Sequence, residues 1–233
     1  MKTIIFAIAL SVAAITFAAS CQTAPTTTNT NTRTNTAVVS SNTNSMMNMN
    51  GNMMNNSSMN HNGMMNHSDM KSSPNAASQP YDLQFIDTMT HHHQGALDMA
   101  KMAVEKTQNA ELKTFAQKII KDQEKEIAQM KDWREKWFAG KPQAMNMEMP
   151  GMNDSMKMMM GDGMKKMEAA SGKEFDLMFL DMMTSHHEGA VVMSKEALTK
   201  AERPEIKTLA NQIIKAQEEE IKRMQSWKTA WSK

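Results

Sequence analysis

Paired histidines occur twice in the sequence, each time among methionines at helical spacing. On a helix, Met89, His92 and Met99 share one face because they lie three and seven residues apart, and His93 lies on the adjoining edge. The second copy of this arrangement consists of Met183, His186, His187 and Met193. Imidazole nitrogens with thioether sulfurs form a soft-to-borderline ligand set that suits copper, especially Cu(I), and also silver. We therefore predict metal binding by these eight residues; the alternative is that they are ordinary core residues.

Methionines also crowd a polar segment, residues 46–70, which holds nine of them together with His61 and His67. A flexible polar segment has no core for them to fill. Outside the cytoplasm, exposed cysteine pairs tend to form disulfides, whereas thioethers remain available as soft ligands until they are oxidised. The segment is therefore expected to collect Cu(I) or Ag(I). Compositional drift and sacrificial oxidant traps are the alternatives.

Other polar residues near the histidines have simpler expected roles. Gln123 and Gln217 lie on apolar stripes, and each is expected either to hydrogen-bond a histidine ring or to link two helices. His91 should face solvent. A solvated helix face is the simplest reading of four glutamates, Glu124, Glu126, Glu218 and Glu220. Since imidazole must be neutral to bind a metal, binding is expected to weaken below about pH 6.

An internal repeat predicts the elements that position these residues. Residues 81–138 align without gaps with residues 175–231 at a constant offset of 94. Each copy has the three- and four-residue periodicity of two amphipathic helices, with breaks near Gln108–Asn109 and Glu202–Pro204. Ser171 and Glu174 have the spacing of a capping box before the third helix. The prediction is an all-α, ferritin-like four-helix bundle, residues 81–233, made from two helical hairpins.

The segment between the repeats, residues 139–174, carries ten methionines together with prolines and glycines. It is expected to be mostly loop, with a short helix within 154–169, and is long enough to cross from one bundle end to the other. The bundle end should be closed by tryptophans, Trp133, Trp137, Trp227 and Trp231.

The first 80 residues predict export and a tether. Residues 1–20 combine Lys2, an apolar run and small residues, which is typical of a signal peptide. Cys21 follows at once and resembles the cysteine of a bacterial lipobox; ordinary secretion with a free thiol is the alternative. Residues 21–80 are rich in Thr, Asn, Ser and Met and are expected to be a disordered tether. The predicted location is the periplasm or cell envelope, with a lipid anchor at Cys21.

The overall composition excludes two classes. The 26 basic and 25 acidic side chains nearly balance and form no basic block, so no nucleic-acid partner is expected. The single cysteine excludes a disulfide framework within the chain.

The repeated motif resembles a known family. The pattern D-x-x-F-x-D-x-M-x-x-H-H-x-G-A, followed by I-I-x-x-Q-x-x-E-I-x-x-M-x-x-W, is similar to the bacterial "domain of unknown function 305" over residues 82–133 and 176–227. The resemblance implies a ferritin-like bundle and, from its better-understood members, periplasmic or secreted copper binding by Met and His ligands. It points to the same eight residues.

Two rivals to copper binding remain at this stage. A ferritin-like di-iron enzyme would need Glu-x-x-His motifs, which the sequence lacks. A helical interaction module of the envelope would explain the bundle but not methionines in a polar tether. We expect a non-enzymatic copper-binding protein, acting in sequestration, chaperoning or tolerance, with an envelope copper-handling protein or a second copy as partner.

Overall fold

The computed structural model describes residues 71–159 and 162–233. The predicted signal peptide, Cys21, the methionines of residues 46–70 and most of the tether lie outside these described residues. Among the helices of residues 71–159 and 162–233, none is both long enough and apolar enough to cross a membrane.

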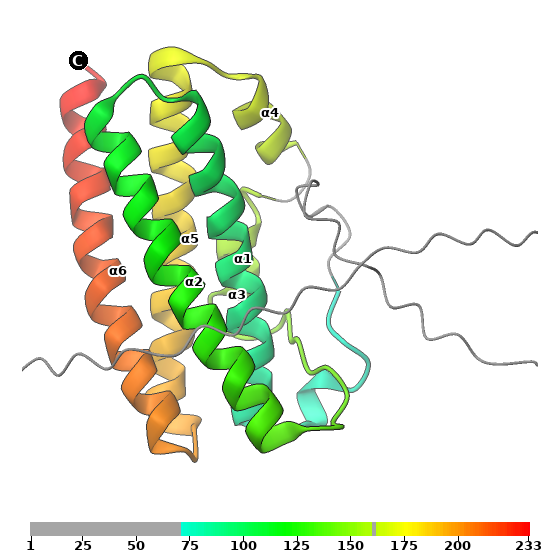
Figure 1. The fold of residues 1–233 in the computed structure, drawn as a ribbon. Helices are drawn as coiled ribbons and strands as arrows, with labels where there is room; N and C mark the ends of the chain where they lie inside the picture. The colour runs from blue at the N-terminus through cyan, green and yellow to red at the C-terminus, as the bar shows by residue number, and fades with distance from the viewer. Residues whose placement is uncertain (1–70, 160–161) are drawn as a thin grey trace, which may run out of the picture. The chain divides into compact units, whose positions relative to one another are not determined.

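Four long helices form the bundle, as predicted (Figure 1). The first hairpin consists of α1 (Tyr81–Lys106) and α2 (Ala110–Phe138), and the second of α5 (Gly172–Lys200) and α6 (Pro204–Trp231). The two helices of each hairpin pack along each other, and the hairpins meet mainly through α1 and α5. α1 and α6 run in one direction and α2 and α5 in the other, so a single long crossover joins the hairpins.

The helix ends follow local sequence signals, with one exception. The Asn109 side chain caps α2 by accepting hydrogen bonds from the backbone N–H groups of Glu111 and Leu112, and Pro204 begins α6. The capping box predicted at Ser171 is wrong, because the Ser171 side chain makes no capping bond. Gly172 has a left-handed φ of 56°, so this first turn lacks the geometry that the reciprocal bonds need.

The crossover runs along the bundle from the end of α2 to the start of α5, as expected from its length (Figure 1). It contains two short helices, α3 (Met152–Met156) and α4 (Gly163–Ala169). Its first part is fixed to α1, since the backbone N–H of Ala144 donates to Asp87 Oδ2 and that of Asn146 to Thr88 Oγ1.

Ordered contacts begin before residue 80, the predicted end of the tether. The N–H of Ser73 donates to the carbonyl of Met145, and a 3₁₀ turn, η2 (Ala76–Ser78), buries Ala76. At least residues 72–79 therefore pack with the bundle, because the crossover and Gln84 of α1 supply hydrogen-bond partners that the sequence of the tether does not reveal.

Most methionines of the crossover are core residues. The buried ones share a place between the crossover and the bundle helices: Met145, Met147, Met149, Met152, Met156, Met159 and Met167. Met158 is exposed. The flexible thioether side chain fills irregular space well, which suits a crossover lying on two helices.

The tryptophans form two stacked pairs, one near the C-terminal end of α2 and one near that of α6. The ring centroids of Trp133 and Trp137 lie 5.0 Å apart, and those of Trp227 and Trp231 lie 5.3 Å apart. Because α2 and α6 run in opposite directions, the pairs lie at opposite ends of the bundle rather than at one end (Figure 1).

Candidate metal centre

The four predicted histidines lie on the facing helices α1 and α5, and all four are fully buried, with 0% exposure. The rings of His92 and His186 are in contact, with centroids 3.7 Å apart and an interplanar angle of 35°. Each is 6.4 Å from the ring that follows it in the sequence, His93 or His187. The repeat thus places four imidazoles in one cluster at the interface between the hairpins.

The rings of His93 and His187, which flank the His92–His186 contact, are each hydrogen-bonded to a glutamate of the neighbouring helix. His93 Nε2 lies 2.8 Å from Glu126 Oε2 on α2, and His187 Nε2 lies 2.9 Å from Glu220 Oε2 on α6. Lys118 donates to the other oxygen of Glu220 at 2.7 Å. The two His–Glu pairs are related by the offset of 94.

The expectation that all four glutamates form a solvated face is therefore wrong for two of them. Glu124 is exposed, and Glu218 is half-buried and pairs with Lys195 rather than with a histidine. Glu126 and Glu220 are two residues further along and turn towards the histidines. A buried imidazole compensates each carboxylate for its lost hydration, which the helical pattern alone does not show.

The crossover supplies a further partner. His92 Nε2 lies 2.9 Å from the hydroxyl of Ser155, on α3, and this hydroxyl donates to the Met152 carbonyl. α3 comes this close because Gly189 on α5 has no side chain: a Cβ there would lie 2.2 Å from Ser155 Cβ and 2.4 Å from the Gly151 carbonyl oxygen. Gly189 is thus required for docking of α3.

The counterpart glycine, Gly95 on α1, makes room for a thioether. A Cβ on Gly95 would lie 3.2 Å from Met159 Sδ and 3.3 Å from His186 Nε2. The sulfur of Met159 and the ring nitrogen of His186 therefore approach the same small volume, which makes Met159 an additional candidate ligand.

The other predicted ligands are core residues of the same two helices. Met89, Met99, Met183 and Met193 are all fully buried on α1 and α5. Their role as ligands stays a prediction. Among residues 71–159 and 162–233, no group of three or more His, Cys, Asp or Glu side chains is arranged so that it could hold a metal ion by itself. A metal bound here would combine imidazoles with thioethers.

Burial determines the charge of the His92 ring. It lowers the pKa of His92 well below the usual 6.5, and the neighbouring His186 and His93 lower it further. For Glu220, burial acts to raise the pKa, but the bonds from His187 and Lys118 outweigh it, so the pKa lies below 4.5. At neutral pH, His92 is therefore neutral and Glu220 is ionised. A neutral imidazole is the form that binds metal ions.

The side-chain oxygens of the two glutamines make neither of the predicted hydrogen bonds. Gln123 and Gln217 are buried, yet the side-chain oxygen of neither has a hydrogen-bond partner within the described part of the chain. No bond from a histidine ring or from another helix reaches these oxygens.

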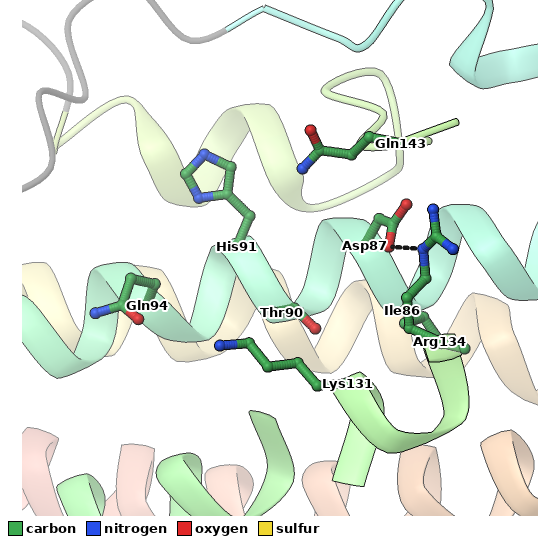
Figure 2. Close-up of a pocket in the computed structure, with 8 residues that line it drawn as sticks. All are labelled: Ile86, Asp87, Thr90, His91, Gln94, Lys131, Arg134 and Gln143. Atoms are coloured by element: carbon green, nitrogen blue, oxygen red, sulfur yellow. Dashed lines mark hydrogen bonds and ion pairs between the residues drawn. The ribbon is translucent and has the colours of Figure 1, made fainter. Parts of the chain in front are cut away.

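His91 belongs to a different place. It is half-buried rather than solvent-exposed, and it lines a surface pocket of about 290 Å³ formed by α1, α2 and Gln143 of the crossover (Figure 2). Arg134 lines the same pocket and is held by Asp87 at 3.0 Å. His91 is replaced by Ser185 in the second repeat.

Sequence reasoning missed four residues of this centre, Glu126, Ser155, Met159 and Glu220. The offset of 94 pairs the two glutamates and so contained a signal for them. Ser155 and Met159 lie in the crossover, which has no repeated counterpart, so only the docking of α3 reveals them.

The chain belongs to the DUF305 family. The family model, described as "Domain of unknown function (DUF305)", matches residues 17–134 and 82–228. Among curated protein sequences, no significant match was found.

Solved structures of related proteins share the fold. CopM in its Cu(II)-bound form is 41% identical, with a TM-score of 0.55, over 64% of this chain and 97% of CopM. CopM in its Cu(I)-bound form is 38% identical, with a TM-score of 0.54, over 66% and 99%. A DUF305 fragment from Deinococcus radiodurans is 29% identical, with a TM-score of 0.57, over 65% and 97%.

Proposed function

We propose that this protein is an exported copper-binding protein, favouring Cu(I), that holds the ion at the histidine cluster between α1 and α5. The single observation that carries the proposal is the contact between two fully buried imidazoles, His92 and His186, with the Met159 thioether beside them. Soft sulfur and borderline nitrogen ligands in a dry site favour Cu(I) over hard cations.

The similarity to CopM supports the same reading, since CopM has been solved with Cu(I), Cu(II) and silver bound. Silver is therefore a second cargo to be expected. We propose sequestration, chaperoning or tolerance rather than catalysis, because histidines with 0% exposure are closed to a substrate.

Export and anchoring are proposed from the first 21 residues. A DUF305 relative from Streptomyces coelicolor, 27% identical, is described as a candidate secreted protein. We infer that the signal peptide is removed and that Cys21 carries a lipid. Replacing Cys21 with Ser should move the protein from the membrane fraction to the soluble envelope fraction, and an unchanged distribution would contradict lipidation.

An anaerobic Cu(I) titration of the full chain against a chromogenic Cu(I) chelator tests the metal site. The double variant His92→Ala/His186→Ala should lose the tightest class of sites, whereas His91→Ala, in the separate pocket, should bind as the wild type does. Circular dichroism would establish that each variant is folded, and His92→Asn provides a smaller change if the double variant is not.

Two other outcomes would redirect the assignment. Equal binding by the wild type and both cluster variants would exclude His92 and His186 as ligands and place the metal on other residues, such as the methionines. An absence of Cu(I) binding by the wild type would favour the helical interaction module.

A further inference from the structure

The buried rings raise the question of which nitrogen is available to a metal. A neutral imidazole carries a proton on one ring nitrogen and a lone pair on the other, and only the lone pair binds a metal ion. The partner of each ring decides between the two forms, because a group that can only accept a hydrogen bond requires a proton on the nitrogen facing it.

Two rings face carboxylates. Glu126 Oε2 lies 2.8 Å from His93 Nε2, and Glu220 Oε2 lies 2.9 Å from His187 Nε2. An ionised carboxylate has no proton to donate. Lys118, bound to the other oxygen of Glu220, favours its ionised form. Both histidines must therefore carry a proton on Nε2.

The third ring, that of His92, faces the Ser155 hydroxyl, which already donates its proton to another acceptor. Ser155 donates its only hydroxyl proton to the Met152 carbonyl at 2.9 Å, because a carbonyl can only accept. The same oxygen lies 2.9 Å from His92 Nε2 and must accept a hydrogen bond from it. His92 therefore also carries its proton on Nε2.

On the other side of these rings, Nδ1 faces no protein partner. The Nδ1 atoms of His92, His93 and His187 are buried, and within the described part of the chain none has a hydrogen-bond partner. A buried polar atom without a partner is unfavourable, and such atoms in native proteins call for a specific reason.

We propose that Glu126, Glu220 and Ser155 are positioning residues, each holding a proton on Nε2 of its own histidine so that the Nδ1 lone pair of that ring is left to bind a soft metal ion, together with thioethers rather than with three imidazoles on one ion. The histidines concerned are His92, His93 and His187. This inference rests on the proposed copper-binding function and deepens it. A carboxylate on the far nitrogen also makes an imidazole a stronger donor to the ion, as in other metal–His–carboxylate arrangements.

Nitrogen-15 NMR of the full chain, labelled at histidine, reads the protonated nitrogen directly. In the metal-free protein, long-range proton–nitrogen spectra should show the Nε2–H form for the three rings, assigned with single His→Gln variants. On addition of Ag(I), a diamagnetic substitute for Cu(I), the Nδ1 signals should shift while Nε2 keeps its proton.

The variants Glu126→Gln and Glu220→Gln test the positioning role. An amide can either donate or accept, so each change removes the constraint on its own histidine. A second tautomer should appear at that ring alone, and Cu(I) affinity should fall about 10- to 100-fold. Glu124→Gln and Glu218→Gln are matched controls, because these glutamates lie on the same two helices at the same offset, Glu124 exposed and Glu218 paired with Lys195. Both changes should leave the histidine spectra and the Cu(I) affinity unchanged.

Three outcomes would overturn the inference, and they separate it from the proposed function. An Nδ1–H form or a doubly protonated ring in the metal-free chain would contradict the hydrogen-bond assignment. If the Nδ1 signals stay fixed while methionine methyl signals move, the protein binds metal but through thioethers. If nothing binds, the proposed function fails, and the Glu and Ser contacts are structural only.

Discussion

At the scale of single residues, burial has a strong effect on the pKa of His92. His92 is fully buried beside three other imidazoles, and its pKa lies well below 6.5. The sequence led us to expect metal binding to weaken below about pH 6. Since the folded ring resists protonation, competition by protons at His92 begins at a lower pH than that.

The same feature makes the stability of the metal-free chain depend on pH. Below about pH 6.5 the unfolded ring takes up a proton that the folded ring does not, so the unfolding free energy falls, by up to about 1.4 kcal/mol per pH unit. Urea unfolding of the metal-free chain should have a lower midpoint at about pH 5.5 than at about pH 7.5.

Two further observations would isolate the contribution of His92. The His92→Gln variant should show a smaller difference between the two midpoints. Glu220, whose pKa is lowered, loses its contribution only as pH falls below about 4.5, outside this window. A wild-type midpoint that does not change between the two pH values would contradict the assignment.

At the scale of elements, the two equivalent glycines have different neighbours. A Cβ on Gly189 would meet Ser155 Cβ at 2.2 Å and the Gly151 carbonyl oxygen at 2.4 Å, so α3 would have to move. A Cβ on Gly95 would meet the flexible end of Met159 at 2.7 Å, which can rotate away. The contact of Gly189 with α3 is therefore rigid, whereas the equivalent contact of Gly95 with the Met159 side chain can adapt.

Gly189→Ala should therefore lower the unfolding free energy by about 1–3 kcal/mol, as forced overpacking commonly does. Gly95→Ala should cost less in stability, yet reduce Cu(I) affinity by filling the space beside His186 Nε2. Denaturant unfolding and the chelator titration, run on both variants, measure the two effects. Equal losses of stability would show that α3 is not held as tightly as the contacts indicate.

These elements also show which features of the fold and of the candidate site the sequence could predict. The repeat at an offset of 94 predicted four helices, both turns and the equivalence of His92 and His186, because helical periodicity and turn residues are local properties. The contact between these two rings was not predicted. Ser155 and Met159 were not found, since their roles come from the docking of a segment outside the repeat. Glu126 and Glu220 were misjudged because a charged residue on a helix is usually solvated, and only tertiary contact shows otherwise.

At the scale of the whole molecule, the crossover makes two nearly equal hairpins unequal. Its methionines fill the surface where α1 and α5 meet, and Asp87 and Thr88 on α1 bind its backbone. The sequence repeat is therefore symmetric, but the surroundings of the histidine cluster are not, and this asymmetry comes from residues 139–174.

Complete enclosure of the histidine cluster affects how fast a bound ion dissociates, as distinct from how tightly it binds. An ion held by side chains with 0% exposure cannot leave until the packing over it opens, so its residence time is set by the frequency of that local opening. Extraction by a competing chelator should then proceed at a rate that becomes independent of chelator concentration. An ion enclosed in this way would not be removed during a brief encounter with a competing ligand. Its release would be limited by the rate at which the protein opens locally.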